Sequence, residues 1–424
     1  MVLRGGVLAG GRRADVAVDF ELGVVLQVGT VEAQPGDHVE PVDGMVLLPA
    51  AAEPHAHLDK AFLAVGAPGA LDSPGGDLAA AIAAMRASDA GRRADEVTRR
   101  AGRALRTLVA HGVTAVRTHV DVRSPFGVGN LRALAAVRQW VTATELADLQ
   151  LVALVDTPLT GTAGAGNRRL LRSALDAGAD VVGGCPYRDP DPRGATALLL
   201  QAAADAGVGV DLHTDETIDP KVLTVAELAM LVAERGPGAG ATASHCVSLG
   251  MQPLAVQRRI AAGLAEAGVS VVTLPQTNLF LQGRQVPTAV PRGLTALPAL
   301  LQAGVTVAGG SDNARDPFCS AGRLDPCETA ALLVMAGHLA PAHAWHACSS
   351  AARVVMGLPA ADLTPGSAAD LVAIEGADLL DAVAGASERR VTVHRGRVVA
   401  RTEVDRQVGT DPPFGAAPMV GAAR

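Results

Sequence analysis

Lysine is almost absent from this chain of 424 residues, which contains only Lys60 and Lys221. The other basic residues are arginines, and they form neither a basic stripe nor an arginine-rich run. The formal net charge is -7, so we expect no nucleic-acid partner. The scarcity of lysine also restricts which metal centres the chain can build.

Paired cysteines and membrane-spanning segments are lacking as well. The five cysteines are scattered without CxxC spacing, so we expect no disulfide framework and a cytoplasmic location. The first residues, MVLRGG, lack the sustained apolar core of a signal peptide. The uncharged stretch 293–311 contains Pro298 and several glycines. We therefore expect a short helix over 296–303, a turn at Gly304 and a buried strand over 305–308, and no membrane span.

What the chain does contain is enough apolar sequence, 49%, for a large core. The two ends of the chain show short β-like runs broken by glycines, with a hairpin turn at Gly396. These runs span 16–18, 24–28, 371–374, 391–393 and 398–399. They predict one small β-sandwich domain that is built from both termini.

The middle of the chain alternates apolar strands with helical stretches, which predicts an α/β protein with a (β/α)8 barrel. The candidate strands are 45–48, 115–118, 151–155, 181–183, 208–212, 241–244, 270–274 and 305–308. The candidate helices include 95–110, 131–144, 168–177, 195–206 and 225–234.

These patterns predict where the domains begin and end. The β-sandwich domain is expected to span 1–48 and 356–409, and the barrel 49–355. A C-terminal tail over 410–424 and a long insert near 66–76, which would form a loop over the site, complete the prediction. The sequence leaves open whether the chain forms a homo-oligomer.

Barrel enzymes place their chemistry at the C-terminal ends of the strands. Here these ends are unusually rich in histidine and carboxylate residues. Buried charge is costly unless it is paired or bound to a metal, so such a set indicates a functional site. The candidates are His55, His57, His119, Asp121, Asp156, His213, Asp215, Glu216, His245, Asp312, Asn313 and Asp316.

The pair His55 and His57 is the first motif. Residues two apart in an extended segment point the same way, so both imidazoles can reach one ion. Glu53 and Asp59 are candidates to orient the two rings as hydrogen-bond acceptors. Alone, such a pair is more often an ordinary couple of partly buried histidines.

Three further motifs have the same ambiguity. His213 offers a nitrogen ligand, and Glu216 beside it could move a proton from water to a leaving nitrogen, although a polar helix cap has the same residues. His245 could polarise water or a substrate oxygen, although a packed core histidine is the alternative. Asp312 could bind a metal and accept a proton, although an Asx turn is the alternative.

Together the four motifs favour chemistry over coincidence. Three histidines and one carboxylate on different strand ends suit one divalent ion, Zn²⁺ or Fe²⁺, with a position open for water. The predicted ligands are His55, His57, His213 and Asp312. Such an ion would lower the pKa of water to near neutrality.

The ordered motifs resemble the amidohydrolase superfamily, and within it the cytosine deaminase branch. They are EPHAHLDK at 53–60, HTDE at 213–216, TASH at 242–245, NLFLQGR at 278–284, SDNARDPF at 311–318 and PGSAADLV at 365–372. The resemblance implies the same four ligands, a proton shuttle at Glu216 and a water-holding or substrate-holding His245. It also implies that activated water attacks an amidine carbon, with loss of ammonia.

Members of the superfamily with two metals use a carboxylated lysine on the fourth strand, but 181–184 contains none. A single ion is therefore expected. The departures from the cytosine deaminases concern the substrate: Asp156 stands where a glutamine is usual, Asn313 in place of a second aspartate and Phe318 in place of a tryptophan. An ionised carboxylate only accepts hydrogen bonds, so Asp156 favours a ring edge rich in N–H groups, such as a guanidine-like ring.

We therefore expect a deaminase of a small nitrogen heterocycle, with Asp156, Asn313 and Phe318 contacting the substrate. Two other amidohydrolase reactions stay open at this point, namely removal of a substituted amine from a triazine-type ring and opening of a cyclic amide. A barrel without catalytic activity is the remaining alternative, and the presence of all four ligands and Glu216 argues against it.

Overall fold

The computed structural model describes residues 1–64, 77–87, 93–236 and 238–407. One of its two sheets contains eight parallel strands in chain order, from β6 to β13. An isolated parallel bridge between Ala56, at the end of the first strand, and Asp312, in the segment after the last strand, nearly closes the sheet. The strands are β6 (Ala51–Ala56), β7 (Val113–Val122), β8 (Asp148–Val155), β9 (Val181–Gly184), β10 (Gly209–Thr214), β11 (Ala241–His245), β12 (Val269–Thr273) and β13 (Val307–Gly309).

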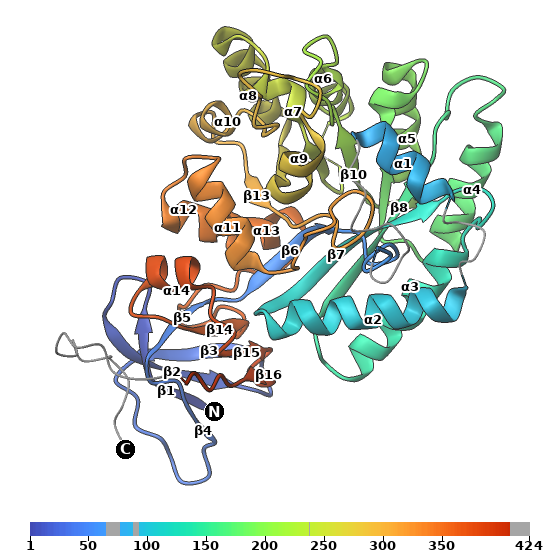
Figure 1. Ribbon diagram of the computed structural model, residues 1–424. Helices are drawn as coiled ribbons and strands as arrows, with labels where there is room; N and C mark the ends of the chain where they lie inside the picture. The colour runs from blue at the N-terminus through green and yellow to red at the C-terminus, as the bar shows by residue number, and fades with distance from the viewer. Residues whose placement is uncertain (65–76, 88–92, 237, 408–424) are drawn as a thin grey trace.

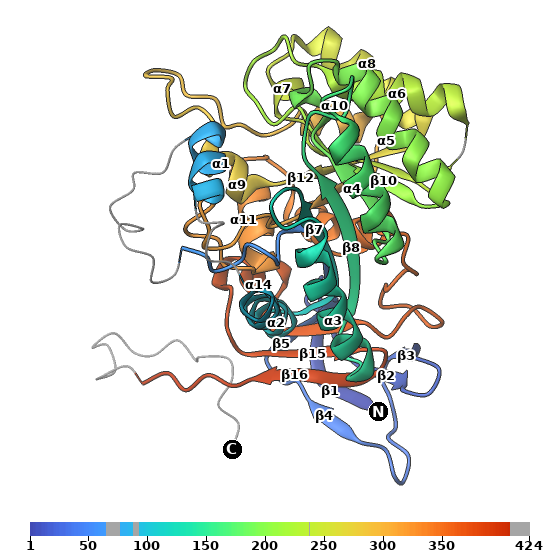
Figure 2. The ribbon, with the colours of Figure 1, turned by 90° about the vertical axis from the view of Figure 1, so that its right-hand side faces the viewer.

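Helices separate these strands and cover the outside of the sheet, as Figures 1 and 2 show. The predicted (β/α)8 barrel is thereby confirmed. The helices that follow β6 to β12 are α1 (Leu78–Ala87), α2 (Ala94–Ala110), α3 (Gly129–Ala143), α4 (Ala165–Asp176), α5 (Pro192–Ala206), α6 (Thr224–Arg235), α7 (Val247–Gly250), α8 (Leu254–Ala267), α9 (Pro275–Leu281) and α10 (Leu297–Gln302). After β13 come α11 (Pro326–Met335), α12 (Pro341–Cys348), α13 (Ser350–Val355) and, beyond the barrel, α14 (Leu379–Gly385).

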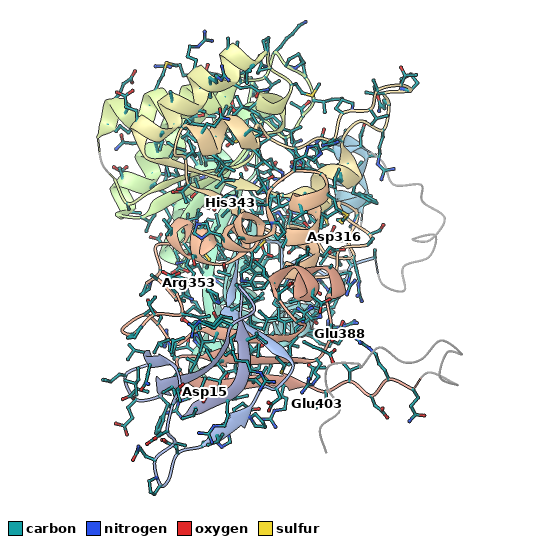
Figure 3. All side chains as sticks on the ribbon, turned by 90° about the vertical axis from the view of Figure 1, so that its left-hand side faces the viewer. Asp15, Asp316, His343, Arg353, Glu388 and Glu403 are labelled. Carbon is teal, nitrogen blue, oxygen red and sulfur yellow. The ribbon has the colours of Figure 1, made fainter. Side chains whose placement is uncertain are left out.

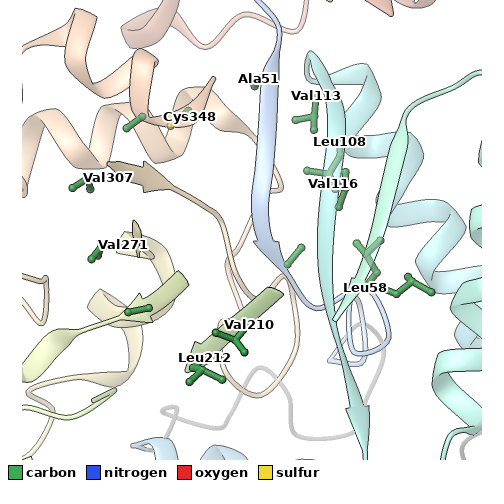
Figure 4. Close-up of a cluster of buried hydrophobic side chains, with 14 of the residues drawn as sticks. Ala51, Leu58, Leu108, Val113, Val116, Val210, Leu212, Val271, Val307 and Cys348 are labelled. Atoms are coloured by element: carbon green, nitrogen blue, oxygen red, sulfur yellow. The ribbon is translucent and has the colours of Figure 1, made fainter. Parts of the chain in front are cut away.

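The main hydrophobic core lies between the barrel strands and the surrounding helices. Aliphatic side chains of the strands, including Val116, Leu212 and Val307, are buried there together with Leu108 of α2 (Figure 4). Because side chains alternate along a strand, the residues between these aliphatic positions face the barrel interior. This alternation leaves room for polar groups inside the barrel.

The second sheet, also of eight strands, draws them from both ends of the chain, as predicted. Its order is β16-β15-β14-β5-β1-β2-β3, and β4 pairs with β1. The strands are β1 (Val2–Leu8), β2 (Arg13–Asp19), β3 (Val24–Gly29), β4 (Val39–Pro41), β5 (Met45–Pro49), β14 (Leu371–Glu375), β15 (Arg390–His394) and β16 (Arg397–Thr402). In Figure 3, Asp15 and Glu403 lie in this terminal domain, away from Asp316 on the barrel side.

One predicted barrel strand was wrong. Residues 45–48 belong to β5, which pairs with β1 and β14 in the terminal sheet, and the first barrel strand is β6 over 51–56. Both strands are buried along nearly their whole length, and only Ala50 separates them in the sequence. Hydrophobicity alone does not distinguish which sheet such a strand joins.

The uncharged stretch 293–311 contains the expected helix, turn and strand. Helix α10 is followed by Gly304, which has a positive φ of 79°, and then by β13. Within the described residues, no helix has both the length and the apolar character that crossing a membrane requires. The predicted insert near 66–76 and the tail over 410–424 fall outside the described residues. The proposed domain limits stay a prediction.

Candidate metal centre and active site

The four predicted ligands meet at the C-terminal end of the barrel, although they come from strand ends far apart in the sequence. The Nε2 atom of His213 lies 3.3 Å from Nε2 of both His55 and His57. The Oδ1 atom of Asp312 lies 3.1 Å from Nε2 of His57 and 3.7 Å from Nε2 of His55. All four residues are at least 95% buried.

Hydrogen bonds on the far side of two rings fix which nitrogen carries the proton. Ser244 donates from Oγ to Oδ1 of Asp211 at 2.8 Å, so its oxygen accepts from Nδ1 of His55 at 2.9 Å. The Nδ1 atom of His57 donates to the carbonyl oxygen of His119 at 3.1 Å. A ring that carries its single proton on Nδ1 presents a bare Nε2 to the centre.

Lone pairs therefore face lone pairs in this cluster. Nε2 of His57 and the carboxylate of Asp312 are both acceptors, yet they lie 3.1 Å apart. Neither carboxylate oxygen of Asp312 has a hydrogen-bond partner among the described residues. Two ligands of a tetrahedral Zn²⁺, each about 2.0–2.1 Å from the ion, would themselves lie about 3.3 Å apart. The residues present thus fit a divalent cation.

The electrostatics of the cluster agree with this fit. Burial, with the neighbouring rings, holds the pKa values of His55 and His213 well below the ordinary value, so both rings are neutral. Burial alone would raise the pKa of Asp312, but neighbouring side chains, Lys60 among them, keep it below the ordinary value. Neutral imidazoles and an ionised carboxylate are the protonation states that bind a cation.

A fifth histidine, His119, lies behind the cluster. Its ring stacks on that of His55 with centroids 3.8 Å apart, and its Nε2 lies 3.6 Å from Oδ1 of Asp211. Burial lowers the pKa of His119 to about 4. Its nitrogen could form a three-histidine group with His55 and His213, but its side chain does not line the pocket.

The backbone at the site is strained. Asp215, His245, Cys246 and Asp312 all have positive φ, between 49° and 70°, although none is a glycine. Such conformations cost about 1–3 kcal/mol each and persist where the surrounding structure imposes them. At these strand ends they direct the side chains of His245 and Asp312 toward the pocket.

Glu53 and Asp59 do not orient the imidazole rings, contrary to expectation. Glu53 accepts from the backbone N–H groups of His55 and Ser311, which ties the end of β6 to the segment after β13. Asp59 accepts from the backbone N–H of Asp121. The observed ring partners, a serine hydroxyl and a carbonyl oxygen, carry no charge and leave no sequence signal of their own.

Beside the cluster lies a pocket of about 730 Å³, open solvent included. Glu216 and His245 line it, with Glu216 Oε1 3.9 Å from Nδ1 of His245. Burial raises the pKa of Glu216, and the nearby charge of Asp312 adds to this effect. The Nδ1 atom of His245 contacts Oδ1 of Asn278 at 3.0 Å.

The three predicted substrate residues also line this pocket. Asp156 follows β8 directly and accepts from Nη2 of Arg86, on α1, at 2.9 Å. Asn313 donates from Nδ2 to Asp316 at 2.7 Å, so one of its amide hydrogens is occupied. The ammonium nitrogen of Lys60 lies over the ring of Phe318, 5.3 Å from the ring centroid.

Several pocket residues were not anticipated. Lys60 is buried and pairs with Asp121 at 2.9 Å; burial opposes its charge, but Asp121 keeps the pKa of Lys60 above the ordinary value. Tyr187 and Arg188 follow β9. The position of Lys60 within the first motif was a usable signal, because the chain has so few lysines. Nothing in the sequence marked Tyr187 or Arg188.

Comparisons with known proteins agree on one family. The family model described as "Amidohydrolase family" matches residues 76–400. A pterin deaminase of Rhizobium rhizogenes is 33% identical over 415 residues, which cover 94% of this chain and 91% of the relative.

Solved structures agree with this assignment. The 5-methylcytosine deaminase of Klebsiella pneumoniae, liganded with phosphonocytosine, superposes with a TM-score of 0.84 at 26% identity, covering 96% of this chain and all of that one. An N-isopropylammelide isopropylaminohydrolase of Burkholderia multivorans superposes with a TM-score of 0.79 at 28% identity, covering 94% of this chain and 98% of that one. The chain belongs to the amidohydrolase family.

Proposed function

We propose that the protein is a metal-dependent hydrolytic deaminase of a small nitrogen heterocycle. The observation that carries the proposal is a buried cluster in which Nε2 of His213 lies beside the facing acceptor atoms of His55, His57 and Asp312. Acceptors repel one another without a cation between them, so this arrangement supports one divalent ion, Zn²⁺ or Fe²⁺. An ion held by these four residues would supply Lewis-acid activation of a water molecule.

Glu216 is the proposed proton carrier. Its side chain lines the same pocket as Asp312, and burial raises its pKa toward the range that suits a general base. The reaction consumes one water: a bond forms between the water oxygen and the ring carbon that carries the amino group, and the carbon–nitrogen bond breaks. Glu216 passes a proton from the water to the nitrogen, which leaves as ammonia.

His245 and Asp312 complete the proposed catalytic set. The Nε2 atom of His245 lies 3.9 Å from Oδ2 of Asp312, with no hydrogen-bond partner among the described residues. This nitrogen is therefore free to hold the attacking water or a substrate oxygen. Asp312 is the second proposed acceptor for a proton of that water.

The substrate end of the pocket supports a ring with N–H groups on its edge. Asp156 lines the pocket, and a carboxylate with about four lone-pair positions can accept from a ring as well as from Arg86. Asn313 and Phe318 are the other proposed contacts. The relatives that act on pterin and 5-methylcytosine support amino-substituted rings.

A second reaction is supported by the Burkholderia neighbour, whose name states that it removes isopropylamine. The same residues would break a ring carbon–nitrogen bond with an alkylamine as the leaving group. Assays of purified protein with pterin, 5-methylcytosine and N-isopropylammelide distinguish the two, because the products are ammonia and isopropylamine. Release of ammonia from either amino-substituted ring supports the proposal, and release of isopropylamine alone contradicts it.

A further inference from the structure

The pocket at the candidate centre adjoins a second hollow of about 920 Å³, open solvent included. The two spaces share five lining residues, namely Leu78, Ile82, Tyr187, Arg188 and Glu216. The second hollow lies between α1, the turn after β9 and residues 281–285. A ring bound beside Glu216 can therefore extend a substituent into the second hollow without leaving the protein.

Some of the basic side chains along this path are paired with carboxylates, and one is not. In the first pocket, Lys60 pairs with Asp121, and Arg86 pairs with Asp156. Arg188 is exposed and lines both spaces, yet no carboxylate of the described residues lies within 4.0 Å of its guanidinium group. An unpaired guanidinium in a concave site is suited to a bidentate contact with a carboxylate of the ligand.

We infer that the substrate carries an acidic substituent and that Arg188 binds it. The inference rests on the proposed function, because it places the ring at the candidate centre and the substituent in the second hollow. Tyr187 stands at the junction, where its buried hydroxyl has no hydrogen-bond partner among the described residues. A polar atom of the substituent would satisfy this hydroxyl.

An alternative role for Arg188 is electrostatic. Its charge helps to lower the pKa of the Glu216 carboxylate, against the larger effect of burial. In that case removing Arg188 would affect every substrate alike and would shift the acidic limb of the rate profile to higher pH. A contact with the substituent would instead change the preference between substrates.

The test compares carboxypterin with hydroxymethylpterin, which differ in the charge of one substituent. In the wild-type protein kcat/KM is expected to favour carboxypterin. In R188M the ratio of the two kcat/KM values should fall about 10- to 100-fold, mainly through KM, as expected for a charged hydrogen bond. R188K should restore part of the preference. R193M removes an exposed arginine that pairs with Glu234 and lines neither hollow, so it should leave the ratio unchanged.

An equal loss for both rings in R188M, or a wild-type preference for hydroxymethylpterin, would overturn the inference. Binding calorimetry with carboxypterin separates this question from the proposed function. If no ring releases ammonia, the deaminase proposal fails, while binding that R188M weakens would still support the acidic substituent. The inference about the acidic substituent is overturned if carboxypterin does not bind, or if it binds the wild-type protein and R188M equally.

Discussion

The ring of His55 is held by Ser244, whose hydroxyl oxygen lies 2.9 Å from Nδ1 of the imidazole. Asp211 accepts the hydroxyl proton at 2.8 Å and is itself held by Arg117 at 2.9 Å. β7 and β10, which supply Arg117 and Asp211, are not neighbours in the sheet, so this chain of contacts crosses the barrel interior. The barrel core thus sets the tautomer of a proposed metal ligand.

Removing this support should weaken metal binding without unfolding the barrel. The S244A variant retains His55 but removes the hydroxyl oxygen that accepts from Nδ1 of its ring, so the proton is no longer fixed on that nitrogen. Loss of such an outer partner typically lowers metal affinity about 10- to 100-fold. A competition titration with a chelator measures this affinity. S248A is the matched control, because Ser248 is also buried but donates to the carbonyl oxygen of Val222; equal affinities of the two variants would refute the role of Ser244.

Replacement of Glu216 tests the proton transfer. E216Q keeps the size of the side chain and removes its basicity, so turnover should fall about 10²- to 10⁴-fold. The metal content should stay at the wild-type value, because Glu216 is not among the proposed ligands. Steady-state kinetics and metal analysis of the same preparation check both statements. E234Q, at an exposed glutamate of α6, is the control. If the turnover of E216Q stays within about threefold of the wild-type value, Glu216 is not the proton carrier.

Variants of Asp156 and Arg86 distinguish a direct contact with the substrate from an effect on the position of helix α1. D156Q should change the preference between pterin and 5-methylcytosine, because an amide also donates hydrogen bonds. R86M should instead raise KM for both rings alike, since Arg86 joins α1 to the end of β8. The pair is partly exposed, so its coupling should stay below about 1 kcal/mol. An unchanged preference in D156Q would show that this carboxylate does not face the ring.

The sequence predicted the main features of the candidate site for a physical reason. His55, His213, His245 and Asp312 all stand at or near strand ends, and a closed barrel brings such ends together whatever their separation along the chain. Partners on separate elements were not predictable in this way. The bond between Arg86 and Asp156 joins residues 70 apart.

The errors have equally specific origins. The buried run 45–56 contains β5 and β6, and only strand pairing assigns them to different sheets. Glu53 was expected at an imidazole because of its proximity in sequence. Its carboxylate instead accepts backbone N–H groups of His55 and Ser311, and these groups leave no mark in the pattern of side chains.

A buried ion pair joins the terminal domain to the barrel and should stabilise the whole chain. Arg390 of β15 binds both carboxylate oxygens of Asp325, at the start of α11, at 2.9 Å each. Breaking a buried pair by removing one partner costs about 3–5 kcal/mol, the value expected for R390M in denaturant unfolding. R397M, which breaks an exposed pair with Glu145, should cost less than about 1 kcal/mol. Similar losses in the two variants would contradict this assignment.

The same pair predicts a dependence on pH. Burial opposes the ionised Asp325, but its bonds with Arg390 hold its pKa below the ordinary value of 3.8. A depressed folded-state pKa stabilises the protein above the ordinary value and loses this effect as pH falls through the folded-state pKa. The free energy of unfolding of the wild type should thus exceed that of D325N at neutral pH, and the difference should shrink below pH 3.8. A difference independent of pH would contradict the pairing.

Metal analysis of the purified protein and of D312A tests whether the four proposed ligands hold a metal ion. Asp312 supplies the only carboxylate of the four proposed ligands, and its oxygens face bare imidazole nitrogens. The wild-type chain should contain about one equivalent of a divalent transition metal, and D312A should lose most of it while remaining folded by circular dichroism. A folded wild-type protein that binds no such metal, or full metal content in D312A, would contradict the proposed metal site.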